Sequence, residues 1–189
     1  MATLIVFGIG AAAIGTLFAL TIVGLVGRRF RFWPPPGRAS WQYRVFWGLF
    51  RVFFVAVIAL SVLEVRAGAW ASGVLSIGGW CLVFFGFGLA TWMTKSLGWG
   101  NAHGEAVELQ TAGWFAYSRN PVYVASIVGM VGLSLAIESR LLHILLAAWG
   151  LLYVVAPFLE EDWLAEQYGD AYRNYLQRVP RFLGRRHDA

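Results

Sequence analysis

Long apolar runs alternate with short polar segments along this chain. A helix needs about 20 apolar residues to cross the roughly 30 Å hydrocarbon core of a bilayer. Residues 2–27 carry no charge, residues 45–63 are interrupted by Arg51 alone, and residues 71–93 are again uncharged. We expect each of these three stretches to form a membrane-spanning helix.

Two shorter apolar stretches follow, at 122–137 and 141–157, and only Glu138, Ser139 and Arg140 separate them. Sixteen or seventeen helical residues reach only about 25 Å, which is marginal for a span. We therefore predict a tight helical hairpin whose inner ends meet protein or water rather than lipid. The predicted fold is an all-α polytopic membrane protein with about five transmembrane helices.

The polar segments divide the chain into two parts. Pro34, Pro35 and Pro36 cannot continue a helix and predict a rigid extended elbow between the first two spans. Residues 1–70 are expected to form a two-helix scaffold, and residues 71–189 a catalytic membrane region. Apolar residues near helical spacing at 159–178 predict two short amphipathic helices on the membrane surface after the hairpin.

The composition agrees with a membrane protein. Of the 189 residues, 59% are hydrophobic and 13% are charged, against about 45–50% and about 25% in a soluble domain. A single cysteine excludes a disulfide framework. The three histidines lie far apart, with no cysteine or carboxylate at metal-ligand spacing, so we expect no metal site.

The positive charges are a topology signal. Twelve of the 15 lysines and arginines fall on one side of the predicted spans, and the opposite side has only Arg66 and Arg140. The twelve are Arg28, Arg29, Arg31, Arg38, Arg44, Lys95, Arg119, Arg173, Arg178, Arg181, Arg185 and Arg186. The positive-inside rule then predicts an outside N-terminus and a cytoplasmic C-terminus. Because membrane topology explains the excess of positive charge, nothing favours a nucleic-acid partner.

Two polar clusters are expected to meet at the cytoplasmic ends of the hairpin. Arg119 and Asn120 precede Pro121 at the start of one helix, where free N–H groups favour an anion. Glu160, Glu161 and Asp162 follow Pro157, and carboxylates at a helix C-terminus are electrostatically costly. The simpler interpretation is that these charges mark the membrane boundary. The functional one is an amphoteric cofactor, held by arginine and carboxylate beside aromatic rings.

These motifs resemble a known family of integral-membrane enzymes. Arg-Asn-Pro-Val-Tyr at 119–123 is followed by Glu-Glu-Asp-Trp-Leu at 160–164 and by Tyr-Gly-Asp-Ala-Tyr-Arg-Asn-Tyr at 168–175. Over roughly residues 80–183 the chain is similar to the isoprenylcysteine carboxyl methyltransferase and phospholipid (phosphatidylethanolamine) N-methyltransferase family. The resemblance implies S-adenosylmethionine as cofactor, bound on the cytoplasmic side under a C-terminal cap.

The resemblance also implies roles for particular residues. Catalytic roles are expected for Arg119, Asn120 and Glu160. Cofactor contacts are expected from Leu109, Gly113, Tyr117, Arg119, Asn120, Tyr123, Glu160, Glu161, Gly86, Gly88 and His103. Without the resemblance, Gly86 and Gly88 are most simply a small-residue face for close helix contact.

One departure from the family concerns Asn120, which stands where the carboxyl methyltransferase branch has a histidine. An amide does not accept a proton at neutral pH, and in-line methyl transfer depends mainly on positioning. We therefore expect an acceptor that arrives ionised, or one whose proton is taken by water or a nearby carboxylate.

Arg51 leaves two interpretations open. Inside the second helix its side chain either extends to the cytoplasmic interface, or faces the pocket and joins the catalytic residues.

The expected function is methyl transfer to a lipophilic carboxylate, amine or thiol dissolved in the bilayer, with membrane lipids as surroundings. The membrane would be the inner or plasma membrane in a bacterium and the endoplasmic reticulum in a eukaryote. One alternative is a reductase of the sterol-reductase group, which needs more phosphate-binding basic residues than are evident. Another is a non-catalytic scaffold or transporter, although a transporter needs ionisable residues at mid-bilayer depth.

Overall fold

The computed structural model describes residues 1–26 and 31–184, and these residues are helical throughout, apart from loops and one isolated bridge between Trp70 and Ile137. The elements are α1 (Ala2–Val26), α2 (Trp41–Arg66), α3 (Gly73–Leu97), α4 (Trp99–Ala102), the 3-10 helix η1 (Gly113–Ala116), α5 (Pro121–Ala136), α6 (Arg140–Tyr168) and α7 (Asp170–Arg178). Helices α1, α2, α3 and α6 are long and apolar enough to cross a membrane, and α5 is a shorter apolar helix. The predicted all-α polytopic fold is confirmed.

Local sequence explains where several helices begin. Ser40 is the N-cap of α2 and accepts a hydrogen bond from the Tyr43 N–H at 3.2 Å, so this helix begins four residues before the apolar run. Pro121 occupies the first turn of α5, where the N–H that it lacks would have had no helical partner. Ser139 caps α6 in the same way as Ser40 caps α2.

Helix α6 corrects one prediction, because it does not end at Pro157. The helix continues from Arg140 to Tyr168 with Pro157 buried inside it. The turns that follow Pro157 make tertiary contacts through Glu160, Glu161 and Leu164, and these contacts outweigh the helix-breaking tendency of the proline. The carboxylates therefore lie inside a helix rather than at its C-terminus, and the expected cost from the helix dipole does not apply.

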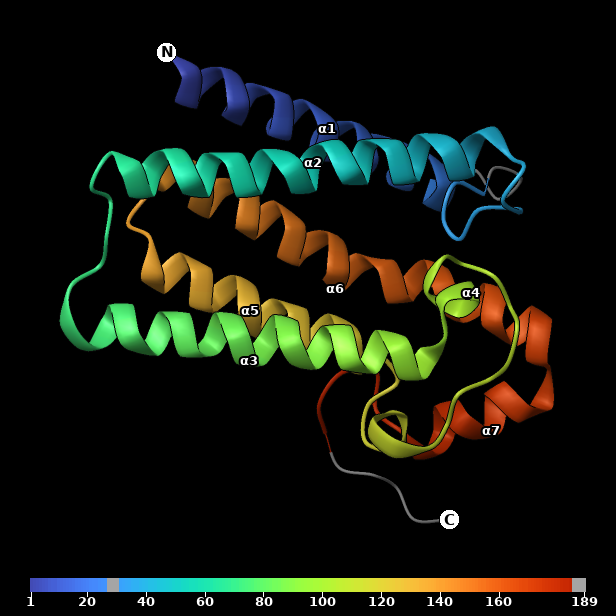
Figure 1. Cartoon of the computed structure of the whole chain (residues 1–189). Coiled ribbons are helices and arrows are strands. Elements are labelled where there is room, and N and C mark those ends of the chain that lie inside the picture. The colour runs from blue at the N-terminus through green and yellow to red at the C-terminus, as the bar shows by residue number, and fades with distance from the viewer. Residues whose placement is uncertain (27–30, 185–189) are drawn as a thin grey trace.

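The helices pack in two groups that α6 connects. Helices α1 and α2 lie together above α6, and α3 and α5 lie together below it (Figure 1). The main apolar core lies between α1, α2 and α6 and includes Leu17, Phe53, Leu60, Leu145 and Trp149. At the hairpin end away from α7, the Ala71 N–H donates to Ala136 O and the Glu138 N–H donates to Ala69 O.

Glycines allow α3 and α5 to approach closely. A Cβ atom added to Gly86 would lie 2.3 Å from the Gly129 nitrogen, and one added to Gly79 would lie 2.7 Å from the Ala136 nitrogen. A Cβ added to Gly88 would meet nothing within 4 Å. Gly86 thus lies in a backbone-to-backbone helix contact of the kind that small residues permit.

We expect Gly86→Ala to lower the free energy of unfolding by about 1–3 kcal/mol, because the methyl group forces two backbones apart. Gly88→Ala, two residues along the same helix, is the matched control and should leave stability unchanged or slightly raised. Thermal unfolding of both variants in one detergent measures the difference. Equal midpoints would contradict the close contact.

The segments that were predicted to lie on one side of the membrane are found at one end of the molecule, which we call the charged end. The α1–α2 connection, α4, the start of α5, the end of α6 and α7 all lie at the same end of the bundle (Figure 1). Arg28, Arg29, Arg185 and Arg186, which also carry the orientation prediction, lie outside the described residues. The orientation across a membrane stays a prediction.

Candidate active site

A cavity of about 380 Å³ opens at the charged end of the bundle. Its walls come from all the helices, from the α1–α2 connection and from the segment between α4 and α5, and they combine aromatic rings with a few polar groups. The polar lining includes Asn101, His103, Glu105, Glu108, Arg119, Asn120, Glu160 and Glu161. A cavity of this size and mixed lining is typical of a small-molecule site.

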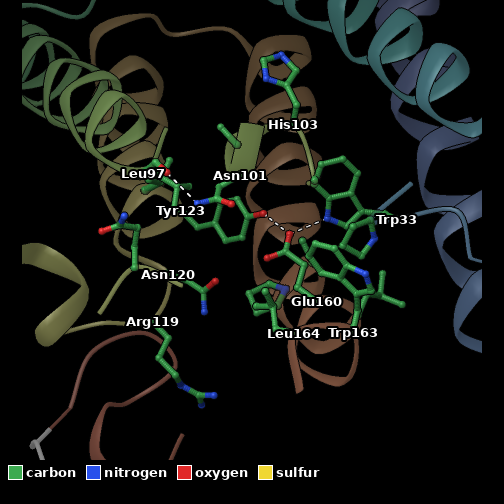
Figure 2. Close-up of a pocket in the computed structure, with 18 of the residues that line it drawn as sticks. Trp33, Leu97, Asn101, His103, Arg119, Asn120, Tyr123, Glu160, Trp163 and Leu164 are labelled. Carbon is green, nitrogen blue, oxygen red and sulfur yellow. Dashed lines mark hydrogen bonds between the residues drawn. The ribbon is translucent and has the colours of Figure 1, made fainter. Parts of the chain in front are cut away.

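Glu160 lies near the middle of this cavity (Figure 2). Its Oε1 accepts hydrogen bonds from Trp33 Nε1 at 2.6 Å and from the Tyr123 hydroxyl at 2.5 Å. Both donors are neutral, and no ion pair between described residues includes Glu160. The carboxylate is thus oriented by two rigid aromatic residues while its charge has no cationic partner.

Glu161, the next residue of α6, is shared by two arginines. Arg181 binds it in bidentate fashion, with Nε at 2.7 Å from Oε1 and Nη2 at 2.6 Å from Oε2. Arg119 Nη1 lies 2.9 Å from Glu161 Oε1. The hydrogen bonds from Arg181 to Glu161 raise the pKa of Arg181 above its ordinary value, so this guanidinium remains charged.

Arg119 is not fully satisfied by Glu161. Its side chain is 9% exposed and its Nη1 is ion-paired with Glu161, but its Nε is buried without a hydrogen-bond partner. Two guanidinium groups share a single carboxylate, so one positive charge here is uncompensated. Buried polar groups in proteins nearly always have partners, and an unpaired donor beside a cavity indicates a ligand.

The C-terminal segment is attached beside the cavity, and Tyr172 and Tyr175 of α7 line it. The Arg119 N–H donates to Pro180 O at 2.9 Å, Asn120 Nδ2 donates to Arg181 O at 3.0 Å, and the Tyr175 hydroxyl donates to Phe115 O at 2.6 Å. Burial raises the pKa of Tyr175 well above its ordinary value, so its hydroxyl keeps the proton that it donates. Helix α7 and residues 179–181 are therefore fastened to the loop that precedes α5.

The α1–α2 connection forms another wall. The Trp33 ring stacks on Phe46 with centroids 4.0 Å apart, and Arg38 makes a bidentate ion pair with Glu105 at 2.7 and 3.0 Å. Gly104, at φ +83°, lies where an added Cβ would be 2.8 Å from Pro35 Cδ. The elbow predicted from the three prolines thus packs against the loop after α4, with Trp33 directed toward Glu160 (Figure 2).

The structure brings most of the predicted site residues to one cavity. They are His103, Leu109, Arg119, Asn120, Tyr123, Glu160 and Glu161. His103 is held by a hydrogen bond from Nδ1 to Trp99 O at 2.6 Å and by the Trp47 ring at 4.5 Å.

Five predicted residues do not line the cavity. Gly86 and Gly88 lie on α3, Gly113 begins η1 at φ +60°, and Tyr117 is 69% exposed. Arg51 is exposed on α2, and the hydrogen bonds and ion pairs of Glu160 and Glu161 with described residues do not include it. The position of Gly86 agrees with a role in close helix contact between α3 and α5, and not with a cofactor contact.

Sequence reasoning missed Trp33 and Arg181. Trp33 lies 127 residues before Glu160, and Arg181 lies 20 residues after Glu161. A tryptophan next to three prolines in an arginine-rich connection was the available signal for Trp33. For Arg181 the sequence offered no signal of a role in the site, because its positive charge is already explained by the predicted membrane orientation.

Comparisons with known proteins match parts of the chain, and one of these matches includes residues of the cavity. The profile of a family described as phospholipid methyltransferase matches residues 74–171. A nickel-cobalt-cadmium resistance protein, NccN, from Alcaligenes xylosoxydans xylosoxydans is 37% identical over 82 residues, which are 43% of this chain and 38% of NccN. The alignment thus spans well under two thirds of that relative, and no solved structure matches the chain. Because the family profile covers more than half of the chain and includes Arg119, Glu160 and Glu161, the chain belongs to the phospholipid methyltransferase family.

Proposed function

We propose that the chain is an S-adenosylmethionine-dependent methyltransferase that acts on a lipophilic acceptor dissolved in the membrane. The observation that carries this proposal is the pair of uncompensated charges in one cavity. Arg119 shares Glu161 with Arg181 and has a buried Nε without a partner, and Glu160 is oriented by neutral donors alone. A zwitterionic amino-acid group, with its carboxylate at Arg119 and its ammonium at Glu160, complements both.

The residues present fit this cofactor. Arg119 would hold the carboxylate, Glu160 would accept from the ammonium, and Tyr123 and Trp33 would keep the Glu160 carboxylate in place. When bound, S-adenosylmethionine supplies an electrophilic methyl group, and S-adenosylhomocysteine is left after transfer. The protein's task is then to orient donor and acceptor and to exclude water, and α7 serves it by placing Tyr172 and Tyr175 in the cavity wall.

The reductase alternative finds less support in the cavity. A nicotinamide cofactor with its phosphates requires several cationic groups. Among the described lining residues, Arg119 is the one arginine, no lysine is present, and four carboxylates come from Glu105, Glu108, Glu160 and Glu161.

Titration calorimetry on the purified chain in detergent tests the proposal. We expect S-adenosylhomocysteine to bind at micromolar concentration, and NADPH not to bind at ten times that concentration. Absence of S-adenosylhomocysteine binding, or saturable binding of NADPH, would overturn the methyltransferase assignment.

Trp33→Phe is expected to weaken S-adenosylhomocysteine binding about tenfold, because phenylalanine retains the stack on Phe46 but cannot donate to Glu160. Trp92→Phe, at an exposed tryptophan outside the cavity, is the control. If Trp33 acts through the carboxylate, Trp33→Phe has almost no further effect once Glu160 has been changed to glutamine. Additive losses would mean that Trp33 contributes by packing alone.

Arg51→Ala should change methyl transfer no more than Arg44→Ala does, because both side chains are exposed and neither lines the cavity. Turnover of the two variants, measured side by side in the same lipid, checks this expectation. A loss of turnover of tenfold or more in Arg51→Ala, without such a loss in Arg44→Ala, would show that Arg51 takes part in the site.

A further inference from the structure

We propose that Thr21 and Trp47 form an acceptor subsite that binds an uncharged oxygen group, such as a carbonyl or phenol, of the lipophilic substrate. This inference rests on the proposed methyl-transfer function and specifies its substrate class. It concerns the part of the cavity that α1 and α2 line, outside the segment that the family profile matches.

The Thr21 hydroxyl is buried but lacks the bond that most hydroxyl groups in these helices make. Six hydroxyls on α1, α2, α3 and α5 donate to the carbonyl oxygen four residues earlier at 2.7–3.2 Å: those of Thr16, Ser61, Thr91, Thr94, Ser96 and Ser126. The other three, on Thr3, Ser76 and Ser134, belong to residues that are only partly buried. Thr21 is 2% exposed, lines the cavity, and its Oγ1 has no hydrogen-bond partner. A buried hydroxyl that forgoes the usual helical bond is available to a ligand.

Trp47 supplies a second free donor. Its Nε1 is buried without a partner, and its ring lines the same cavity. The ring lies 4.5 Å from that of His103, and His103 and Arg119 lie at opposite ends of the view in Figure 2. The Trp47 ring therefore lies beside His103 and not among the groups that would hold the cofactor carboxylate.

The surroundings of these two donors favour an uncharged group. Phe46, Phe50 and Leu152 supply apolar lining, and Arg119, the one arginine among the described lining residues, lies beside Glu161, where it would hold the cofactor carboxylate. Trp33, whose ring centroid is 6.1 Å from that of Trp47, donates to the Glu160 carboxylate. Among the described lining residues, the basic side chains are Arg119, which lies beside Glu161, and the imidazole of His103. A phosphate or carboxylate at Trp47 would therefore have no lysine or second arginine of the described lining beside it and would face a negative neighbour, whereas a carbonyl or phenol oxygen accepts from neutral donors without that cost.

The test uses two amphiphiles with equal tails, 2-decyl-1,4-benzoquinone and decyl phosphate. Quinone binding to the full chain in detergent, with S-adenosylhomocysteine present, is followed by quenching of tryptophan fluorescence. We expect saturable binding to the unmodified chain, and a roughly tenfold weaker affinity in both Thr21→Val and Trp47→Phe, each of which loses one donor. Decyl phosphate should not displace the quinone at equal concentration.

Thr16→Val and Trp92→Phe are matched controls, since Thr16 bonds back to Ala12 and neither side chain lines the cavity. Calorimetry with S-adenosylhomocysteine on the same samples separates the two proposals. If the cofactor product binds all variants normally but the quinone fails to bind, binds Thr21→Val and Trp47→Phe like the unmodified chain, or is displaced by decyl phosphate, the subsite is wrong and the methyltransferase proposal stands. If the cofactor product does not bind the unmodified chain, the proposed function itself fails.

Discussion

Replacing Glu160 by glutamine is expected to weaken S-adenosylhomocysteine binding about 100-fold, because the ligand's ammonium then loses its charged partner inside the cavity. Glutamine has nearly the same volume, and its carbonyl oxygen can still accept from Trp33 and Tyr123. The fold should therefore be retained, and thermal unfolding of the variant should remain close to that of the unmodified chain.

A second ligand makes this experiment specific for the charge. 5′-Methylthioadenosine contains the adenosine and thioether of S-adenosylhomocysteine but lacks its amino-acid group. Its affinity should be unchanged by Glu160→Gln, so that the preference for S-adenosylhomocysteine disappears. Glu166→Gln, at an exposed position on the same helix, is the matched control. Parallel losses for both ligands would show that Glu160 shapes the cavity rather than recognises the ammonium.

The second large effect is expected for Glu161→Gln, which removes the one carboxylate shared by Arg119 and Arg181. Loss of one partner from a fully buried pair costs about 3–5 kcal/mol, and a loss of about 2 kcal/mol is expected here. The smaller value reflects the exposure of the Arg181 side chain, which is 32% against 14% for Glu161. Unfolding in detergent, monitored by helical circular dichroism, measures the change.

The same substitution should release the C-terminal segment. Residues 179–181 are fastened through Arg181, Pro180 and Asn120, so cleavage by trypsin after Arg178 and Arg181 should become at least tenfold faster in Glu161→Gln. Asp170→Asn removes only the exposed pair with Arg173 and should leave both stability and these cleavage rates nearly unchanged. Unaltered proteolysis in Glu161→Gln would show that the segment is held by the apolar contacts of Tyr172 and Tyr175 instead.

The spanning helices were predictable because bilayer thickness imposes a length on every apolar run. All five runs became helices, and they brought Arg119 and the α6 carboxylates to one end as expected. The end of α6 was mispredicted because proline is a local signal, whereas the contacts that carry the helix past Pro157 come from distant segments. Gly113 and Tyr117 precede residues of the cavity by a few positions but turn away from it, which sequence proximity does not reveal.

The hydrogen bond between Trp33 and Glu160 joins residues 127 positions apart, and this has a consequence for biosynthesis. During translation, the aromatic donor is made before the second hydrophobic segment, and its acceptor is made only with the last one. Until α6 is inserted, Trp33 has no carboxylate to meet, and Arg119 lacks Glu161 as well. Nascent chains that stall before residue 160 thus contain most of the lipid-facing surface but no charge-complementary site, and cofactor affinity should appear only at the end of synthesis.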